Sequence, residues 1–245
     1  MKTYPTVLVV DDDPVSMAIV ALLLHSEDFS VLRATDGYEA SQLLQACRSR
    51  GEVPPTVLVD LHMPGVNGFE LARECAQTTP RPRLVAMSAT EVDRSRLQDF
   101  DDFLLKPIDL DLLRAALAGR AGSLASATTP LSTAPALDPS TLTKLRAIMP
   151  PEAIRELYTT YISDTRTRIA ELERCTRTGD AEGTRRCAHM LKGSAAMAGV
   201  QGIAGIAAAF ESGAAAKMNH KSLFHELRIA CDDVEQAMAQ RASEE

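Results

Sequence analysis

Apolar and polar positions alternate in blocks along the first half of the chain. Five short apolar runs predict β-strands at residues 6–10, 30–34, 56–60, 83–88 and 102–106. The segments between and after them space their apolar residues as amphipathic helices do, at 14–26, 37–49, 67–76, 91–98 and 109–118. Strands that alternate with helices form parallel sheets covered on both faces. The pattern predicts an α/β domain with a doubly wound, five-stranded parallel sheet.

After residue 136 the apolar spacing is helical throughout. Three stripes recur at the three- and four-residue intervals of one helix face. Their members are Ile154, Leu157, Tyr158, Tyr161, Ile162, Thr165, Ile169 and Leu172; Ile203, Ile206, Ala207 and Phe210; and Leu223, Leu227, Ala230, Val234 and Met238. Asp138 followed by Pro139 predicts the start of a further helix. With the segment around His189, these helices predict an all-α antiparallel four-helix bundle preceded by a short helix.

A stretch rich in Ala, Ser, Thr and Pro separates the two halves. It reads GRAGSLASATTPLSTAPA and carries one charge, which is typical of a flexible linker. We therefore expect a domain at residues 1–120, a linker at 121–136 and a second domain at 137–245. A flexible chain of about 16 residues spans roughly 20–24 Å, so group transfer between the halves within one chain is reachable but not required.

Composition narrows the class of partner. The net charge of −7 disfavours nucleic acid, whose phosphates need a basic surface. The five cysteines are widely spaced and form no CxxC pair, which favours reduced thiols over a disulfide framework or a zinc site. The apolar run near the N-terminus is short and meets three aspartates, so we expect no signal peptide, and no run reaches membrane-spanning length. We expect a cytoplasmic protein that binds neither nucleic acid nor a membrane.

Chemically active side chains follow the predicted strands of the first half. Asp11 and Asp12 come after the first strand, and Asp60, Ser88 and Lys106 end the third, fourth and fifth. The carboxyl ends of parallel strands meet at one edge of a sheet. Clustered carboxylates need a cation, and Mg²⁺ takes oxygen ligands and shares its sites with phosphate. Helix capping is the alternative, and it suits Asp13 before a proline. It does not account for the others, which together can accept and hold a phosphoryl group.

Residues 1–120 resemble a response-regulator receiver domain, a flavodoxin-like fold. The motifs VLVVDDDP, VLVDLHMPGVNGFEL, MSAT and FLLKP occur in the order of that family. The resemblance implies that Asp60 is the phosphoacceptor. It also implies that Asp12, Asp60 and the backbone carbonyl of His62 bind Mg²⁺, with Asp11 acting through a water molecule.

The same resemblance assigns roles near the last two strands. It implies that Ser88 binds a phosphoryl oxygen and switches position, that Lys106 pairs with the phosphate, and that Phe103 is the switch aromatic. A cis peptide bond is expected before Pro107. The sequence departs from the family in one respect. Only 17 residues separate Ser88 from Lys106, and the usual Gly-Ala before the fifth strand is absent, so the helix between them should be short.

The segment CAHMLKGSAAMAG in the second half places a histidine beside a cation and a glycine. On a helix, Cys187, Met190, Leu191, Met197 and Ala198 gather on one apolar face. His189, Lys192 and Gly193 lie on the opposite face, with Arg185 and Arg186 one turn earlier. A structural histidine is the alternative that these residues leave open. The polar surroundings favour a solvent-facing nucleophile that a partner can approach over the glycine.

This segment resembles the signature of the histidine-phosphotransfer (Hpt) domain, and residues 136–243 match that bundle in helix number and length. The resemblance implies that His189 carries the phosphoryl group, that Lys192 offsets its charge and that Gly193 admits a receiver. With a receiver in the same chain, it implies a two-component phosphorelay protein without kinase activity of its own. The sequence contains no GxxxxGK[ST], GxGxxG or kinase ATP lid.

Several partners and alternatives follow from that interpretation. A sensor or hybrid histidine kinase is expected to act in trans, and a downstream response-regulator receiver is expected to take the output. In one alternative, phosphorylation of Asp60 only controls access to the bundle, without transfer inside the chain. In another, the protein drains phosphate from a kinase.

Overall fold

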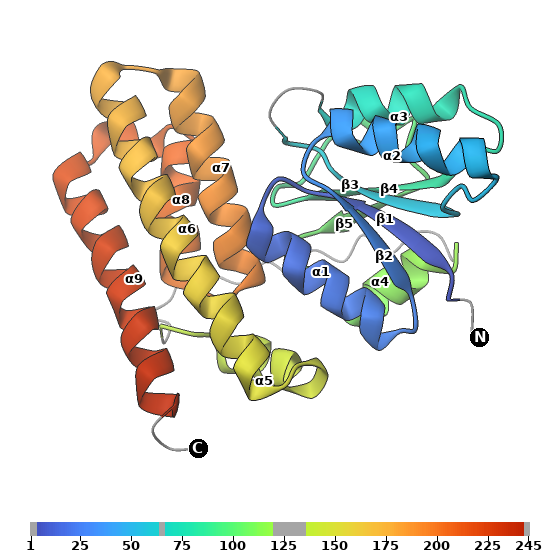
Figure 1. The fold of residues 1–245 in the computed structure, drawn as a ribbon. Coiled ribbons are helices and arrows are strands. Elements are labelled where there is room, and N and C mark those ends of the chain that lie inside the picture. The colour runs from blue at the N-terminus through green and yellow to red at the C-terminus, as the bar shows by residue number, and fades with distance from the viewer. Residues whose placement is uncertain (1–3, 64–66, 120–135, 243–245) are drawn as a thin grey trace. The chain divides into compact units, whose positions relative to one another are not determined.

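The computed structural model of the protein describes residues 4–63, 67–119 and 136–242 (Figure 1). The chain divides into two compact units, Met1–Ala127 and Thr128–Glu245. Most of the segment expected to be a flexible linker lies outside the described residues. The two units are therefore described one at a time.

The first unit contains a five-stranded parallel sheet in the order β2-β1-β3-β4-β5. The strands are β1 (Thr6–Val10), β2 (Ser30–Ala34), β3 (Thr56–Asp60), β4 (Arg83–Ser88) and β5 (Asp102–Leu105). Its helices are α1 (Pro14–Ser26), α2 (Gly37–Arg50), α3 (Gly68–Ala76) and α4 (Leu110–Leu117). The strands begin and end within one residue of the predicted positions, and the predicted doubly wound α/β fold is confirmed.

Helices cover both faces of this sheet, α2 and α3 over one face and α1 and α4 over the other (Figure 1). The central strands β1 and β3 are almost entirely buried, as expected for strands with helices on both sides. Asp13 caps α1 by accepting hydrogen bonds from the backbone N–H groups of Val15 and Ser16. The capping role expected for Asp13 is thus confirmed.

The prediction of a helix at residues 91–98 is wrong. That segment forms one 3₁₀ turn, η1 (Arg94–Arg96), with Asp93 accepting a hydrogen bond from the backbone N–H of Ser95. None of the three residues in the turn is buried, so this segment has no apolar face to hold a longer helix against the sheet. The short connection between β4 and β5 leaves room for this turn instead of a full helix.

The second unit is helical. Its elements are α5 (Pro139–Ile148), α6 (Pro151–Thr178), α7 (Ala181–Met197), α8 (Gln201–Glu211), η2 (Ala214–Lys217) and α9 (His220–Ala242). Helix α6 packs against α7 and α9, and α8 packs against α7 and α9, so the four helices close a bundle. Short turns reverse the chain between them, and Gly179 adopts the left-handed conformation, with φ of 73°, that ends α6. The predicted four-helix bundle with a short preceding helix is confirmed.

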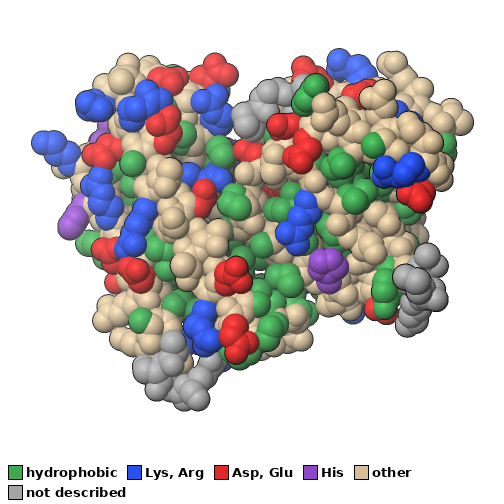
Figure 2. All heavy atoms as spheres, viewed as in Figure 1, with side chains coloured by type: hydrophobic (Ala, Val, Ile, Leu, Met, Phe, Trp, Pro, Cys, Tyr) green, Lys and Arg blue, Asp and Glu red, His purple; other side chains and the backbone are tan. Residues whose placement is uncertain are grey.

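The bundle core follows the predicted stripes. All eight residues of the α6 stripe are buried, and Tyr158 donates a hydrogen bond from its hydroxyl to the carbonyl of Ala198. Asp138 caps α5 by accepting from the backbone N–H of Thr141, with Pro139 at the first helical position. Figure 2 shows acidic and basic side chains interspersed over the visible surface of this unit. Among the described helices, none is long and apolar enough to cross a membrane.

Candidate functional site

The first candidate site lies at the carboxyl edge of the sheet, where three strands end. Asp60 is the last residue of β3, Asp11 follows β1, and Lys106 follows β5. The Lys106 ammonium donates to Asp60 Oδ2 at 2.5 Å and to Asp11 Oδ2 at 2.7 Å. All three side chains are buried. The fold therefore joins residues 46 and 95 positions away from Lys106 into one ion-pair network.

Burial and charge set the protonation of this network. Burial is the largest influence on Asp11 and raises its pKa to about 6, against the opposing charge of Lys106 and with the help of the neighbouring Asp60 charge. Burial alone would lower the pKa of Lys106, but the charges of Asp11 and Asp60 outweigh it and raise that pKa. Lys106 is therefore a permanent cation beside the candidate phosphoacceptor.

Asp11, Asp12 and Asp60 form the group expected to hold a cation. One carboxylate oxygen from each lies within 4.8 Å of the others. A set of hard oxygen donors with excess negative charge fits Mg²⁺ better than a softer metal. Asp60 Oδ1 also accepts a hydrogen bond of 2.8 Å from the backbone N–H of His62, which fixes the orientation of the carboxylate. The donor set therefore fits the expected ion.

Asp11 has more protein contacts than the sequence indicates. In addition to Lys106, it accepts a hydrogen bond from the Ser16 hydroxyl at 2.6 Å and one from the backbone N–H of Asp13 at 3.0 Å. Ser16 was not among the predicted site residues. It lies in the first turn of α1, where only the tertiary fold brings it against Asp11.

The predicted switch residues lie beside this cluster. Ser88, the last residue of β4, is completely buried, and its hydroxyl accepts a hydrogen bond of 3.1 Å from the backbone N–H of Thr90. The same oxygen lies 3.4 Å from Nδ1 of His62. Phe103, on β5, is half-buried. The peptide bond between Lys106 and Pro107 is cis, as expected.

The start of α3 is packed directly against the end of β3. A Cβ atom on Gly68 would lie 2.4 Å from the backbone oxygen of Asp60, closer than real Cβ contacts allow. Asn67 precedes it and forms a capping box with Glu70, in which each side chain accepts from the other residue's backbone N–H. Glycine at position 68 therefore allows a capped helix to begin directly against the end of β3.

The second candidate site centres on His189 of α7. Its Nδ1 lies 2.6 Å from Oε1 of Glu211, the last residue of α8, and Lys192 donates to Oε2 of the same carboxylate at 3.2 Å. Burial alone would raise the pKa of Glu211, but the hydrogen bond and charge of His189 and the charge of Lys192 outweigh it and lower that pKa. The ionised carboxylate can only accept, so Nδ1 carries the proton and donates. In an imidazole with its proton on Nδ1, the lone pair suited to nucleophilic attack is on Nε2.

The projection around α7 left out one partner of His189. The ring points toward Glu211 of α8, whose carboxylate it contacts. The helical projection placed residues correctly around α7 itself, but it could not include the carboxylate that α8 supplies. Arg185 and Arg186 are exposed as predicted.

Glu211 was missed by the sequence analysis. It lies 22 residues after His189, and the intervening turn sets the pairing of α7 with α8. One signal was present, because Glu211 is the one charged residue of α8, whose sequence is QGIAGIAAAFE. A charge at the end of such a helix needs a polar partner nearby.

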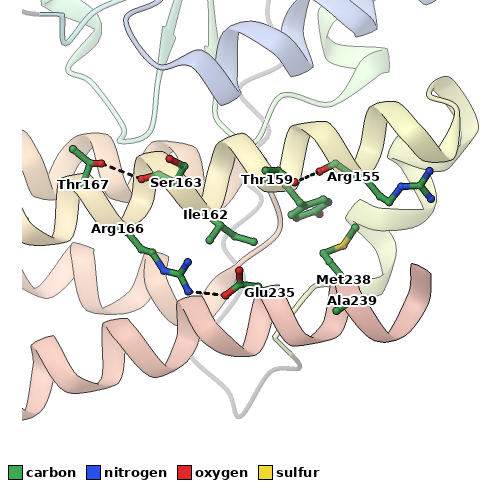
Figure 3. Close-up of a pocket in the computed structure, with 10 residues that line it drawn as sticks. Arg155, Thr159, Ile162, Ser163, Arg166, Thr167, Glu235, Met238 and Ala239 are labelled. Atoms are coloured by element: carbon green, nitrogen blue, oxygen red, sulfur yellow. Dashed lines mark hydrogen bonds and ion pairs between the residues drawn. The ribbon is translucent and has the colours of Figure 1, made fainter. Parts of the chain in front are cut away.

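A groove of about 600 Å³ lies elsewhere on the bundle, between α6 and α9 (Figure 3). Its lining includes Ile162 and Met238, and the ion pair between Arg166 and Glu235 crosses it at 2.6 Å. The residues that line it do not include His189 or its partners. This groove is therefore separate from the candidate site around His189.

Both units match known protein families. Residues 7–118 match the response regulator receiver domain, and residues 156–237 match the Hpt domain. Protein PilH of Pseudomonas aeruginosa is 33% identical over 123 residues, which cover 46% of this chain and 98% of PilH. The virulence sensor protein BvgS of Bordetella pertussis is 31% identical over 209 residues, which cover 77% of this chain but 16% of BvgS.

One solved structure similar to this chain is that of response regulator protein TrrA from Thermotoga maritima, in complex with Mg(2+)-BeF. Its match covers 46% of this chain and 96% of that chain, at 24% identity and a TM-score of 0.41. Among the curated relatives, the chain spans nearly all of PilH but only a small part of BvgS.

Proposed function

Because the chain belongs to the two-component phosphorelay proteins, with a receiver domain and an Hpt domain, we propose that it relays phosphoryl groups through Asp60 and His189. The observation that supports this most directly is that each residue lies beside a group suited to its chemistry. Asp60 contacts the Lys106 cation, and His189 contacts the Glu211 anion.

At the receiver, Asp60 attacks the phosphorus of a phosphohistidine on a kinase partner. A P–O bond to the carboxylate forms as the P–N bond of the donor breaks, and the donor imidazole leaves. Asp11, Asp12, Asp60 and the His62 carbonyl are proposed to hold Mg²⁺, which supplies charge neutralisation for the transferring group when bound. Lys106 is already within hydrogen-bond reach of Asp60 and can follow the charge onto the phosphoryl oxygens.

Ser88 and Phe103 are proposed to respond to that new group. The Ser88 hydroxyl can turn from Thr90 to donate to a phosphoryl oxygen, and this movement opens space that Phe103, half-buried on β5, can enter. The receiver surface then differs between the two states, which would let a partner distinguish them.

At the bundle, Nε2 of His189 attacks the acyl phosphate of a receiver. A P–N bond forms as the P–O bond to the aspartate breaks, and the aspartate leaves as a carboxylate. Glu211 keeps the proton on Nδ1 and stabilises the positive charge that the ring gains. Lys192 is placed to offset the phosphoryl charge. We propose Glu211 as a positioning residue that acts through the imidazole.

The partners of the chain are proposed by class: a histidine kinase that acts in trans and a downstream response-regulator receiver. A single-turnover experiment tests the relay. The full chain, Asp60→Asn and His189→Gln are incubated with a labelled phospho-kinase and Mg²⁺, and the label is assigned by its chemistry. Acyl phosphate is lost in base or hydroxylamine, whereas phosphohistidine survives base.

We expect Asp60→Asn to lose the base-labile label and His189→Gln to lose the base-stable one. Base-labile, Mg²⁺-dependent label that persists in Asp60→Asn would overturn the assignment of the phosphoacceptor. If both labels form but never exchange within one chain, the receiver instead controls access to the bundle.

A further inference from the structure

Two cysteines far apart in the sequence meet between α6 and α7. Cys175 and Glu171 are four residues apart on α6 and therefore share a helix face, and Cys187 lies on α7. The two sulfur atoms and one oxygen of Glu171 all lie within 4.8 Å of one another. Both thiols are buried and neither is part of a disulfide. None of the three residues has a role in the proposed phosphotransfer.

We propose that Glu171, Cys175 and Cys187 form a binding site for a thiolate-preferring divalent cation of the Zn²⁺ class. Ligand atoms bound to one tetrahedral Zn²⁺ lie about 2.0–2.3 Å from the metal, so they are roughly 3–4 Å from each other. The observed cluster needs only a small contraction to reach that spacing. Two sulfur donors separate this site from the receiver's acidic pocket, whose donors are all oxygens.

Gly183 brings Asp180, a possible fourth ligand, close to the thiol of Cys175. A Cβ atom on Gly183 would lie 2.8 Å from the sulfur of Cys175 and 2.3 Å from Oδ2 of Asp180. The glycine therefore keeps side-chain atoms out of the space beside the thiol. The other oxygen of Asp180 accepts the capping hydrogen bond from the backbone N–H of Gly183. Oδ2 of Asp180 or a water molecule would complete four-coordination.

One cation already contacts the cluster. Arg174 donates to both oxygens of Glu171, at 2.6 and 2.8 Å, and its guanidinium lies 3.4 Å from the sulfur of Cys175. The Arg174 and Glu171 side chains are about half exposed, at 51% and 45%. Exposed pairs of this kind contribute little to stability, so a metal can take Glu171 from Arg174 at small cost.

Metal binding at this site is a proton-exchange reaction without a redox step. Burial raises the pKa of the Cys187 thiol to about 11, so the metal-free thiol is neutral at pH 7. One divalent cation would bind two thiolates, and two protons would leave to solvent. The bound ion would join α6 to α7 near the turn that connects them.

Cobalt(II) is the probe for the test, because thiolate ligands give it charge-transfer absorption in the near ultraviolet. The full chain is titrated with Co²⁺ under a non-thiol reductant and excess Mg²⁺, which occupies oxygen-only sites. We expect one equivalent of Co²⁺ to develop this absorption together with the visible bands of four-coordinate cobalt, and Zn²⁺ to abolish both.

Matched variants locate the site. Cys175→Ser and Cys187→Ser should lose the charge-transfer absorption, whereas Cys231→Ser, a buried thiol on α9, should keep it. Glu171→Gln changes a half-exposed side chain that is safe for the fold, and it should weaken Co²⁺ binding at least about tenfold. Absence of thiolate absorption in the full chain would refute the site, as would its persistence in Cys187→Ser or unchanged affinity in Glu171→Gln.

Discussion

At the scale of single residues, the two proposed phosphoacceptors have opposite electrostatic partners. Asp60 is an anion that must approach another anion, so a buried ammonium beside it lowers the repulsion. The imidazole of His189 gains positive charge when it attacks, so a carboxylate beside its other nitrogen favours the change. The same reaction, run in opposite directions, thus uses a lysine at one site and a glutamate at the other.

Replacement of Lys106 and replacement of Asp12 should impair phosphorylation for different reasons. Lys106→Ala leaves Asp11 and Asp60 buried without their cation, which should cost about 3–5 kcal/mol of unfolding free energy. Asp12→Ala removes a half-buried proposed metal ligand and weakens the affinity for Mg²⁺. Raising Mg²⁺ should therefore restore phosphorylation of Asp12→Ala far more than that of Lys106→Ala, as measured by labelling across a Mg²⁺ titration. Equal rescue of the two variants would contradict these roles.

Glu211 should affect the rate of transfer through the imidazole. Glu211→Gln can still accept from Nδ1 but lacks the charge, and Glu211→Ala removes the acceptor. We expect phosphotransfer to His189 to slow in the first variant and to slow further in the second, as measured by single-turnover kinetics. The base-stable phosphohistidine label should still form slowly in both variants. Slow formation indicates a positioning role for Glu211, whereas loss of the phosphoacceptor would abolish that label. Unchanged rates in both variants would remove Glu211 from the mechanism.

His189→Gln should also cost stability. The ring is hydrogen-bonded to Glu211, so its removal takes one partner from that carboxylate, leaves the contact with Lys192, and should cost about 1–3 kcal/mol. A chemical-denaturation curve of the full chain measures this difference. A variant as stable as the parent would show that the His189–Glu211 contact contributes nothing to the fold.

At the scale of elements, the placement of α3 depends on a missing side chain. Gly68 begins this helix where its backbone nearly touches the carbonyl of Asp60. On α8, by contrast, Gly202 is exposed and a Cβ atom there would meet only Ala230, at 3.9 Å. Two helical glycines therefore differ in what they allow: the first permits a close backbone approach, and the second only lowers helix propensity.

Alanine at these two positions should have opposite effects. Gly68→Ala should destabilise the receiver unit by about 1–3 kcal/mol, because the helix start or the Asp60 strand must move. Gly202→Ala should stabilise the bundle by about 0.5–1 kcal/mol. Thermal melts with separate probes for each unit measure both. A neutral Gly68→Ala would show that α3 tolerates displacement from β3.

At the scale of the whole molecule, each unit has its own core and its own proposed site. The receiver core lies between the sheet and its helices, and the bundle core follows the stripe of α6. Every proposed Mg²⁺ ligand belongs to the first unit. Independent cores are the basis for the proposed domain boundaries at 120 and 137.

The fragments 1–120 and 137–245 should therefore each fold alone. We expect both to melt cooperatively, and Mg²⁺ to raise the melting temperature of the first fragment. Asp12→Ala should abolish that rise, which makes it the matched control. If the circular dichroism spectrum of either fragment is that of an unfolded chain, the proposed domain boundary is wrong.

The sequence by itself determined most of the elements and the identity of the main chemical groups. Alternating apolar runs specify buried parallel strands, and the stripes of α6 specify a helix with one buried face, because each periodicity suits one backbone geometry. Asp60 and Lys106 could be named because strand ends gather at one edge of a parallel sheet. The segment 91–98 was misassigned because helical spacing alone cannot hold a helix that has no buried face.

Only the tertiary structure decided which side chains meet across elements. The spacing of the five cysteines predicted separate reduced thiols and argued against a zinc site, yet the packing of α6 on α7 brings Cys175 and Cys187 together. The packing of α8 on α7 likewise brings Glu211 to His189, a partner that the pattern of α7 alone could not include. A pattern along one helix fixes directions around its own axis. The partner that each direction meets depends on how the helices pack, and that is a property of the whole bundle.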